Sequence, residues 1–195
     1  MSLTASFLAA VVVLTAPQGV ETPYCSLAAE TSLEQPVDAF EDGPGGWRRW
    51  GEGGCKTAAA DLIAAYRGAH AQSLRRDDRV MLSFHEAQLR ASENDYASAS
   101  ALLRSIDGAA ASPATALYYD ATLAFLQSDL ESLREIRARL AALPVPPGFE
   151  RARADYIARY GGEGPEWPLN IGVVDGLVRC FGQPYTVAYS CPAQP

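Results

Sequence analysis

Two stretches of the chain, residues 79–107 and 113–141, carry the same order of apolar and polar positions. They align at an offset of 34 residues, and the matching pairs are Phe84 with Tyr118, Ala87 with Ala121, Asp95 with Asp129, Tyr96 with Leu130, and Ala99 with Leu133. A repeat of this length built from two amphipathic helices is typical of a helical solenoid, in which each unit buries its apolar face against its neighbours. The pattern therefore predicts two antiparallel helix pairs.

Helical spacing of apolar residues continues through most of the chain after Trp47, and no alternation typical of a strand interrupts it. Ser112 followed by Pro113 is a favourable helix start, and Ser128 with Glu131 has the spacing of a capping box. We therefore predict an all-α fold with helices over residues 55–71, 78–93, 95–107, 113–127, 129–143, 148–160 and 171–182.

The segment from Ala116 to Leu143 resembles a tetratricopeptide repeat, and the preceding copy is similar to it. The first copy keeps the small residues Ala87 and Ala99 and the Asp95-Tyr96 start of the second helix. In the family, the first helix of each pair lines a concave groove. The resemblance therefore implies an antiparallel arrangement with one binding face.

Both copies depart from the family pattern. The first-helix tryptophan is replaced by Ser83 and Leu117, and the turn glycine by Asn94 and Ser128. When the 34-residue period is extended toward the N-terminus, Trp50 aligns with the repeat pattern. The glycines that follow Trp50 disfavour a first helix there, so this third match is only half a repeat. The resemblance implies a short antiparallel helical-hairpin solenoid of about two to three repeats, with divergent capping helices and a C-terminal cap over residues 148–195.

The start of the chain has a different character from the repeats. An apolar run from Phe7 to Leu14 with a helix-breaking end predicts a secretory signal peptide over residues 1–19. This run is too short to cross a bilayer. Residues 20–46 carry six acids before Gly43 and no Lys or Arg, so we predict an irregular acidic N-terminal arm. Residues 47–195 then form a single tetratricopeptide-like helical domain.

Four cysteines, Cys25, Cys55, Cys180 and Cys191, follow the signal segment and fit two disulfides of an exported protein. Three pairings are possible, and we favour Cys25 with Cys55 and Cys180 with Cys191 because each joins a chain end to the nearest helix. Free buried thiols in a cytosolic protein are the alternative. The expected compartment is periplasmic or secreted.

Composition narrows the classes of function. The formal net charge is −7, and no basic stripe is present to follow a phosphate backbone, which disfavours nucleic-acid binding. No segment after Leu14 is apolar enough to span a membrane, so we expect no membrane insertion of the mature chain. With two histidines and no metal-ligand spacing, no metal site is predicted.

Motifs for catalysis and cofactor binding are absent from the sequence. It contains no P-loop, dinucleotide fingerprint or nucleophile elbow, and His85-Glu86 lacks the second histidine of a metalloprotease because Leu89 stands at that position. We therefore expect no cofactor and no enzymatic activity.

The resemblance assigns a partner-binding groove to the first helices of the two copies. Its residues are Met81, Phe84, Gln88, Tyr118, Thr122 and Phe125. An aromatic, uncharged groove suits a peptide with apolar anchors. Alternatively, the acidic arm or the capping helices fill this groove, and the aromatic residues belong to the core.

The resulting expectation is an exported, non-enzymatic helical-repeat protein that binds a protein or peptide partner of unknown identity through the aromatic groove. Two alternatives remain. One is a structural accessory subunit of an envelope assembly. The other is a small-molecule-binding protein or enzyme with a pocket formed by His85, Glu86, Tyr118, Tyr119 and Asp120.

Overall fold

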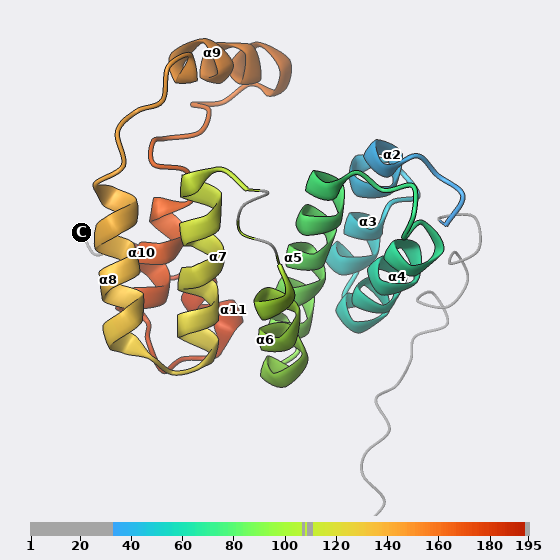
Figure 1. The fold of residues 1–195 in the computed structure, drawn as a ribbon, viewed down its shortest axis with the longest axis horizontal. Helices are drawn as coiled ribbons and strands as arrows, with labels where there is room; N and C mark the ends of the chain where they lie inside the picture. Colours follow the sequence, from blue (N-terminus) through green and yellow to red (C-terminus); the bar gives the residue numbers. More distant parts are fainter. Residues whose placement is uncertain (1–32, 107, 109–110, 194–195) are drawn as a thin grey trace, which may run out of the picture.

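The structure, a computed structural model, describes residues 33–106, 108 and 111–193, and this part of the chain contains helices and no strand (Figure 1). The predicted all-α class is confirmed. None of the described helices is both long and apolar enough to cross a membrane. The predicted signal peptide, Cys25 and the first part of the acidic arm lie outside the described residues. In chain order the helices are α2 (Val37–Asp42), α3 (Trp47–Glu52), α4 (Lys56–Ala69), α5 (Arg76–Ser92), α6 (Tyr96–Ser105), α7 (Pro113–Leu126), α8 (Leu130–Ala141), α9 (Phe149–Tyr160), α10 (Ile171–Arg179) and α11 (Tyr185–Tyr189).

The two predicted helix pairs, α5 with α6 and α7 with α8, are joined by the same kind of turn. Asn94 and Ser128 both adopt a left-handed backbone, with φ of 63° and 58°. The next residue in each copy, Asp95 or Asp129, is the N-cap, and its side chain accepts a hydrogen bond from the backbone N–H three positions later. The two copies therefore form helical hairpins with matching turns at the offset of 34 seen in the sequence.

The start of α8 differs from the predicted capping box. Ser128 lies in the left-handed turn, and Asp129 caps the helix by accepting from the Ser132 N–H at 3.0 Å. An aspartate at this position also places its negative charge at the positive end of the helix dipole. The predicted start of α7 is confirmed, because the Ser112 hydroxyl accepts from the Thr115 N–H at 3.2 Å.

The buried apolar side chains form two clusters. The N-terminal cluster comes from α2 to α5 and from Cys55, the N-cap of α4. It contains Phe40, Trp47, Trp50, Cys55, Ala59, Ala60, Leu62, Ile63, Tyr66, Leu82 and Leu89. The C-terminal cluster comes from α5 to α8, α10 and α11, and contains Phe84, Ala87, Ala91, Ala99, Leu103, Ala114, Leu117, Tyr118, Ala121, Ala124, Phe125, Leu126, Leu133, Leu140, Val174, Leu177, Tyr185 and Ala188.

Helix α5 contributes to both clusters. Leu82 and Leu89, seven positions apart, belong to the N-terminal cluster. Phe84, Ala87 and Ala91 follow a spacing of three and four residues and belong to the C-terminal cluster. This spacing places the two sets on different faces of one helix. Helix α5 therefore lies between the two clusters (Figure 1).

The C-terminal residues pack on the second hairpin. Helix α10 contacts α7 and α8, and α11 contacts α10 and α5. Cys180 and Cys191 form the predicted disulfide, which closes a loop containing α11. Cys55 is also disulfide-bonded, and its predicted partner Cys25 lies outside the described residues. The end of the chain thus covers the hairpin from one side.

Helix α9, the first part of the predicted C-terminal cap over residues 148–195, does not pack on the core. It stands apart from the other helices (Figure 1), and none of its residues is buried. Tyr156 and Tyr160 are 47% and 64% exposed. Phe149, Ala152, Tyr156 and Tyr160 follow helical spacing on one side of α9, but none of them is buried in the described structure.

Part of the region predicted as an irregular arm is helical. Helix α2 places the fully buried Phe40 against the Tyr66 ring, with a centroid distance of 3.8 Å. The following turn brings the backbone back on itself, and a Cβ at Gly46 would lie 2.5 Å from the Phe40 carbonyl oxygen. Burial of the Phe40 ring therefore holds this segment in a defined conformation. The acidic composition of the segment did not predict this order.

Candidate functional site

The predicted groove residues lie on α5 and α7, whose rings Phe84 and Tyr118 are 5.0 Å apart. Four of the six are buried, at 1–6% exposure, namely Phe84, Tyr118, Thr122 and Phe125. Met81 and Gln88 are half-buried. Phe84, Tyr118 and Phe125 belong to the C-terminal cluster, and the Thr122 hydroxyl donates to the backbone carbonyl of Tyr118 at 2.9 Å.

Helix α11 covers part of this face. Tyr185 is only 2% exposed, and its ring lies 6.1 Å from the Phe125 ring. The side-chain Nε2 of Gln88 donates hydrogen bonds to the hydroxyl groups of Tyr118 at 3.0 Å and Tyr185 at 3.4 Å. The chain's own C-terminal cap therefore occupies part of the face, as the alternative interpretation of the sequence suggested.

Two recesses remain beside α11, and both are lined by His85, Gln88 and Tyr189. The polar recess has a volume of about 250 Å³ and is also lined by Arg48, Phe84, Thr115, Tyr118, Tyr119 and Asn170. The aromatic recess has a volume of about 180 Å³ and is also lined by Trp47, Leu89, Ser92 and Tyr185. Together they bring side chains from α3, α5, α7 and α11 to one surface.

His85 borders both recesses, and a buried carboxylate fixes its orientation. Its Nδ1 lies 3.1 Å from Oε1 of Glu41, which is 4% exposed. Trp47 Nε1 donates to the same oxygen at 2.8 Å, and Arg48 donates to the other oxygen at 2.8 Å. The Nδ1–H group therefore points to the carboxylate, and in the neutral form of the ring the lone pair is on Nε2.

The pKa of Glu41 is lower than that of an ordinary glutamate. Burial raises this pKa, but the hydrogen bonds from His85 and Trp47 and the charges of His85 and Arg48 stabilise the carboxylate more strongly. Burial also raises the pKa of Tyr118 and Tyr185. At neutral pH the site thus contains an ionised Glu41 and protonated tyrosine hydroxyl groups.

The alternative pocket forms only in part. Its predicted residues are His85, Glu86, Tyr118, Tyr119 and Asp120. Glu86 is directed toward α4, where its carboxylate accepts from Arg67 at 2.6 Å. Asp120 is exposed and makes no hydrogen bond within the described residues. The carboxylate partner of His85 is Glu41, which lies 44 positions earlier in the chain.

Several residues of the site are absent from the sequence-based prediction. They are the lining residues Trp47, Arg48, Tyr185 and Tyr189, and Glu41, the buried partner of His85. Glu41 falls in a segment predicted to be a solvated arm. Tyr185 and Tyr189 follow Pro184 with a spacing of four residues, which would place both rings on one face of a helix. That spacing is the one signal that could have identified α11.

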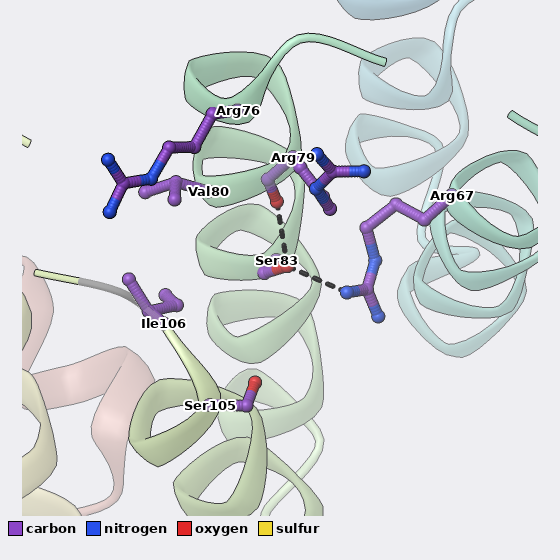
Figure 2. Close-up of a pocket in the computed structure, with 7 residues that line it drawn as sticks. All are labelled: Arg67, Arg76, Arg79, Val80, Ser83, Ser105 and Ile106. Carbon is purple, nitrogen blue, oxygen red and sulfur yellow. Dashed lines mark hydrogen bonds between the residues drawn. The ribbon is translucent and has the colours of Figure 1, made fainter. Parts of the chain in front are cut away.

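Another cavity, of about 480 Å³, lies beside the first two turns of α5 and is lined by Arg67, Arg76, Arg79, Val80, Ser83, Ser105 and Ile106 (Figure 2). Arg67 donates to the Ser83 hydroxyl at 2.7 Å and to Glu86 at 2.6 Å, which links α4 to α5. In Figure 2, Arg79 extends from α5 toward Arg67 of α4, whereas Arg76 extends from α5 in the opposite direction. The three guanidinium groups do not converge on one position.

An apolar groove of about 720 Å³ lies where α8 is followed by α9, and its lining includes residues 143–149, Ala152 and Trp167. Few polar atoms face it, so its lining favours apolar groups and offers few hydrogen bonds to orient a ligand. In the described ranges, no group of three His, Cys, Asp or Glu side chains could hold a metal ion.

Comparison of the chain with protein-family models, with curated proteins and with solved structures gave no match. The two recesses around His85 and Gln88 are therefore interpreted from their own geometry. They combine aromatic rings with hydrogen-bonding groups on the face that the sequence analysis assigned to partner binding.

Proposed function

We propose that this protein is an exported, non-enzymatic helical-repeat protein that binds a peptide or protein partner on the face formed by α5, α7 and α11. One observation carries this proposal. The polar and aromatic recesses adjoin each other at His85, Gln88 and Tyr189 on the face predicted for binding. A bound segment that crosses from one recess to the other would contact all three residues.

The chemistry of the recesses supports a peptide ligand. Aromatic rings provide contact area for apolar side chains, while Gln88, Thr115 and Asn170 provide polar groups suited to a peptide backbone. Tyr118 and Gln88 are already held by their mutual hydrogen bond. Their positions are therefore set before a partner arrives, which reduces the entropy lost on binding.

The compartment is inferred from the disulfides. The bond between Cys180 and Cys191 and the disulfide of Cys55 are typical of proteins from oxidising environments. The predicted signal peptide agrees with export. Both observations support the proposed periplasmic or secreted location.

Peptide selection followed by site-specific photo-crosslinking tests the proposal. Peptides selected from a random display library on the full chain would be crosslinked to variants with a photoreactive residue at position 119 or, as a control, at position 160. Tyr119 lines the polar recess and Tyr160 is on the separate helix α9. We expect crosslinks from position 119 only. Crosslinks of equal yield from both positions, or from position 160 alone, would reject this binding face.

A small-molecule-binding or enzymatic role is a second candidate, and the Glu41–His85 pair favours it. A carboxylate on Nδ1 leaves Nε2 of the imidazole ready to accept a proton or a ligand hydrogen bond. Screening of metabolites against the wild-type protein and His85→Ala, with binding and turnover both measured, tests this role. Hits whose binding is unchanged in His85→Ala would exclude it.

A further inference from the structure

The aromatic recess has a lining that suits a positively charged ligand. Four rings surround it: those of Trp47 and His85 on one side, and those of Tyr185 and Tyr189 on α11. The rings within each pair are in contact, with centroid distances of 5.2 Å for Trp47 and His85 and 5.6 Å for Tyr185 and Tyr189. Aromatic faces carry partial negative charge and attract cations within about 6 Å of the ring centre.

A buried carboxylate strengthens this preference. Both Trp47 and His85 direct an N–H group to the same oxygen of Glu41, at 2.8 and 3.1 Å. Donation to an anion increases the electron density of both rings, which makes their faces more attractive to a cation. The guanidinium carbon of Arg48 lies 4.5 Å from the Trp47 ring centroid, so one face of this indole is occupied by a cation whose charge is offset by Glu41 and Asp42.

The charges near the recess also favour a cation. No Lys, Arg, Asp or Glu lines the aromatic recess. Arg48, beside it, is paired with both Glu41 and Asp42, so these three side chains leave one negative charge when His85, the other partner of Glu41, is neutral. The whole chain has a net charge of −7, which favours encounter with a basic partner.

Two side-chain oxygens can bind the hydrogen atoms of a primary ammonium group. The amide nitrogen of Gln88 is occupied by Tyr118 and Tyr185, and within the described residues its oxygen accepts no hydrogen bond. The Ser92 hydroxyl donates its hydrogen to the backbone carbonyl oxygen of Gln88 at 2.8 Å, which leaves the hydroxyl lone pairs available. Both residues line the recess, so ammonium donors and oxygen acceptors match.

We propose that the aromatic recess binds the ammonium group of a lysine side chain on the partner peptide. This inference rests on the proposed function and specifies one residue of the ligand. The four-carbon stem of lysine would lie against the ring of Tyr189, with the ammonium group between Trp47 and the oxygen of Gln88. The adjoining polar recess would take the neighbouring peptide backbone.

A titration followed by NMR tests the lysine site. The probe is a short alanine peptide with one central lysine, added at millimolar concentration to the full disulfide-bonded chain. The matched control is the same peptide with norleucine, which has the same chain length without the charge. We expect the lysine peptide to shift the Trp47 indole N–H signal and to bind at least about threefold more tightly than the norleucine peptide.

Variants of Tyr189 locate the effect. This residue is 41% exposed, so its replacement leaves the core intact. Tyr189→Ala removes one ring and should weaken lysine-peptide binding by about two- to thirtyfold, the range of a cation–aromatic contact. Tyr189→Phe retains the ring and should stay within about twofold of wild type. Tyr160→Ala on α9 removes an exposed tyrosine far from the recess and should have no effect.

Three results would overturn the lysine site. The first is equal binding of the lysine and norleucine peptides. The second is lysine-peptide binding that leaves the Trp47 signal unshifted. The third is a shift of this signal by tetramethylammonium but not by the lysine peptide, which would assign the recess to a small quaternary ammonium ligand instead.

This experiment separates the lysine site from the proposed function. Selected peptides that crosslink at position 119 and bind independently of lysine would retain the peptide-binding function and reject the lysine site. A specific lysine response with no peptide captured at position 119 would reject the peptide-binding function and retain an ammonium site.

Discussion

The two hydrophobic clusters share α5 but are stabilised by different interactions. The N-terminal cluster borders two buried carboxylates, Glu41 and Glu86, each held by cationic partners. The C-terminal cluster is larger and apolar, and the disulfide between Cys180 and Cys191 closes the loop beside it. The first cluster is therefore sensitive to the protonation of specific groups, whereas the second depends on packing and on one covalent bond.

The two clusters differ because their helices differ in length and in the number of side chains they bury. Helices α2 and α3 have six residues each and bury few side chains, so hydrogen bonds from Trp47, Arg48 and His85 to Glu41 fix their positions. Helices α7 and α8 have 14 and 12 residues and pack along their length. Short helices contribute little stability of their own, and tertiary contacts must hold them.

Removal of a large side chain from the C-terminal cluster should have the largest effect. Leu177 on α10 is fully buried, and Leu177→Ala should lower the free energy of unfolding by about 2–5 kcal/mol. Urea denaturation followed by circular dichroism measures this loss. Leu130→Ala, at a half-buried position of α8, is the control and should cost less. Equal losses in the two variants would contradict the central place of α10 in this cluster.

Loss of the C-terminal disulfide should have the next largest effect. Cys180→Ser combined with Cys191→Ser opens a loop with a sequence separation of 11, and chain entropy predicts a loss of about 3 kcal/mol. Hydrogen exchange should increase first in α11, which lies within the loop. Faster exchange in α2 and α3 before α11 would contradict the assignment of this bond to the C-terminal cluster.

Acid should weaken the N-terminal cluster through Glu41. The folded-state pKa of this residue lies below its unfolded value of 4.5, so the carboxylate stabilises the fold above that pH and loses its contribution as the pH falls through the folded pKa. At pH 7, Glu41→Gln should lower the free energy of unfolding by about 2 kcal/mol. The difference from wild type should shrink in acid.

Urea denaturation at several pH values measures this effect. Glu135→Gln, an exposed residue of α8 with no hydrogen bond within the described residues, is the control. Its difference from wild type should be small at every pH. A Glu41→Gln difference that stays constant from neutral to acidic pH would contradict the role given to the ionised carboxylate.

Glycine substitutions in the two hairpin turns should have the smallest effect on stability. Both Asn94 and Ser128 have a left-handed backbone, which asparagine tolerates better than serine. Ser128→Gly should therefore raise the free energy of unfolding by about 0.5–1 kcal/mol, and Asn94→Gly by less. Thermal unfolding measures both variants. Ser98→Gly, inside α6, should instead destabilise, and a loss of stability in Ser128→Gly would contradict the strain assigned to its turn.

The sequence was sufficient to predict the longer helices and the matching turns. The spacing of apolar residues and the capping residues are local signals that the sequence displays directly. The observed N-caps Ser112, Asp95 and Asp129 lie at the predicted helix starts or within one position of them. Helices α2, α3 and α11 were not predicted, because their five or six residues are too few for a clear period. Their stability comes from burial of Phe40, Trp47 and other residues in the folded protein.

The candidate site was predictable only where the repeat determined it. Gln88 and Tyr118 lie on α5 and α7, the first helices of the two copies, and their hydrogen bond joins the copies. The pairing of His85 with Glu41 depends on a turn between α2 and α3 that carries no repeat signal. The coverage of this face by Tyr185 depends on how the end of the chain folds back, which local sequence patterns do not determine.

The position of α5 has a consequence for how the molecule unfolds. Leu82 and Leu89 leave the N-terminal cluster, and Phe84 leaves the C-terminal cluster, whenever this helix detaches. Neither cluster can lose α5 without exposing side chains of the other to water. We therefore expect one cooperative transition, with calorimetric and van't Hoff enthalpies that agree, although the molecule contains two separate clusters.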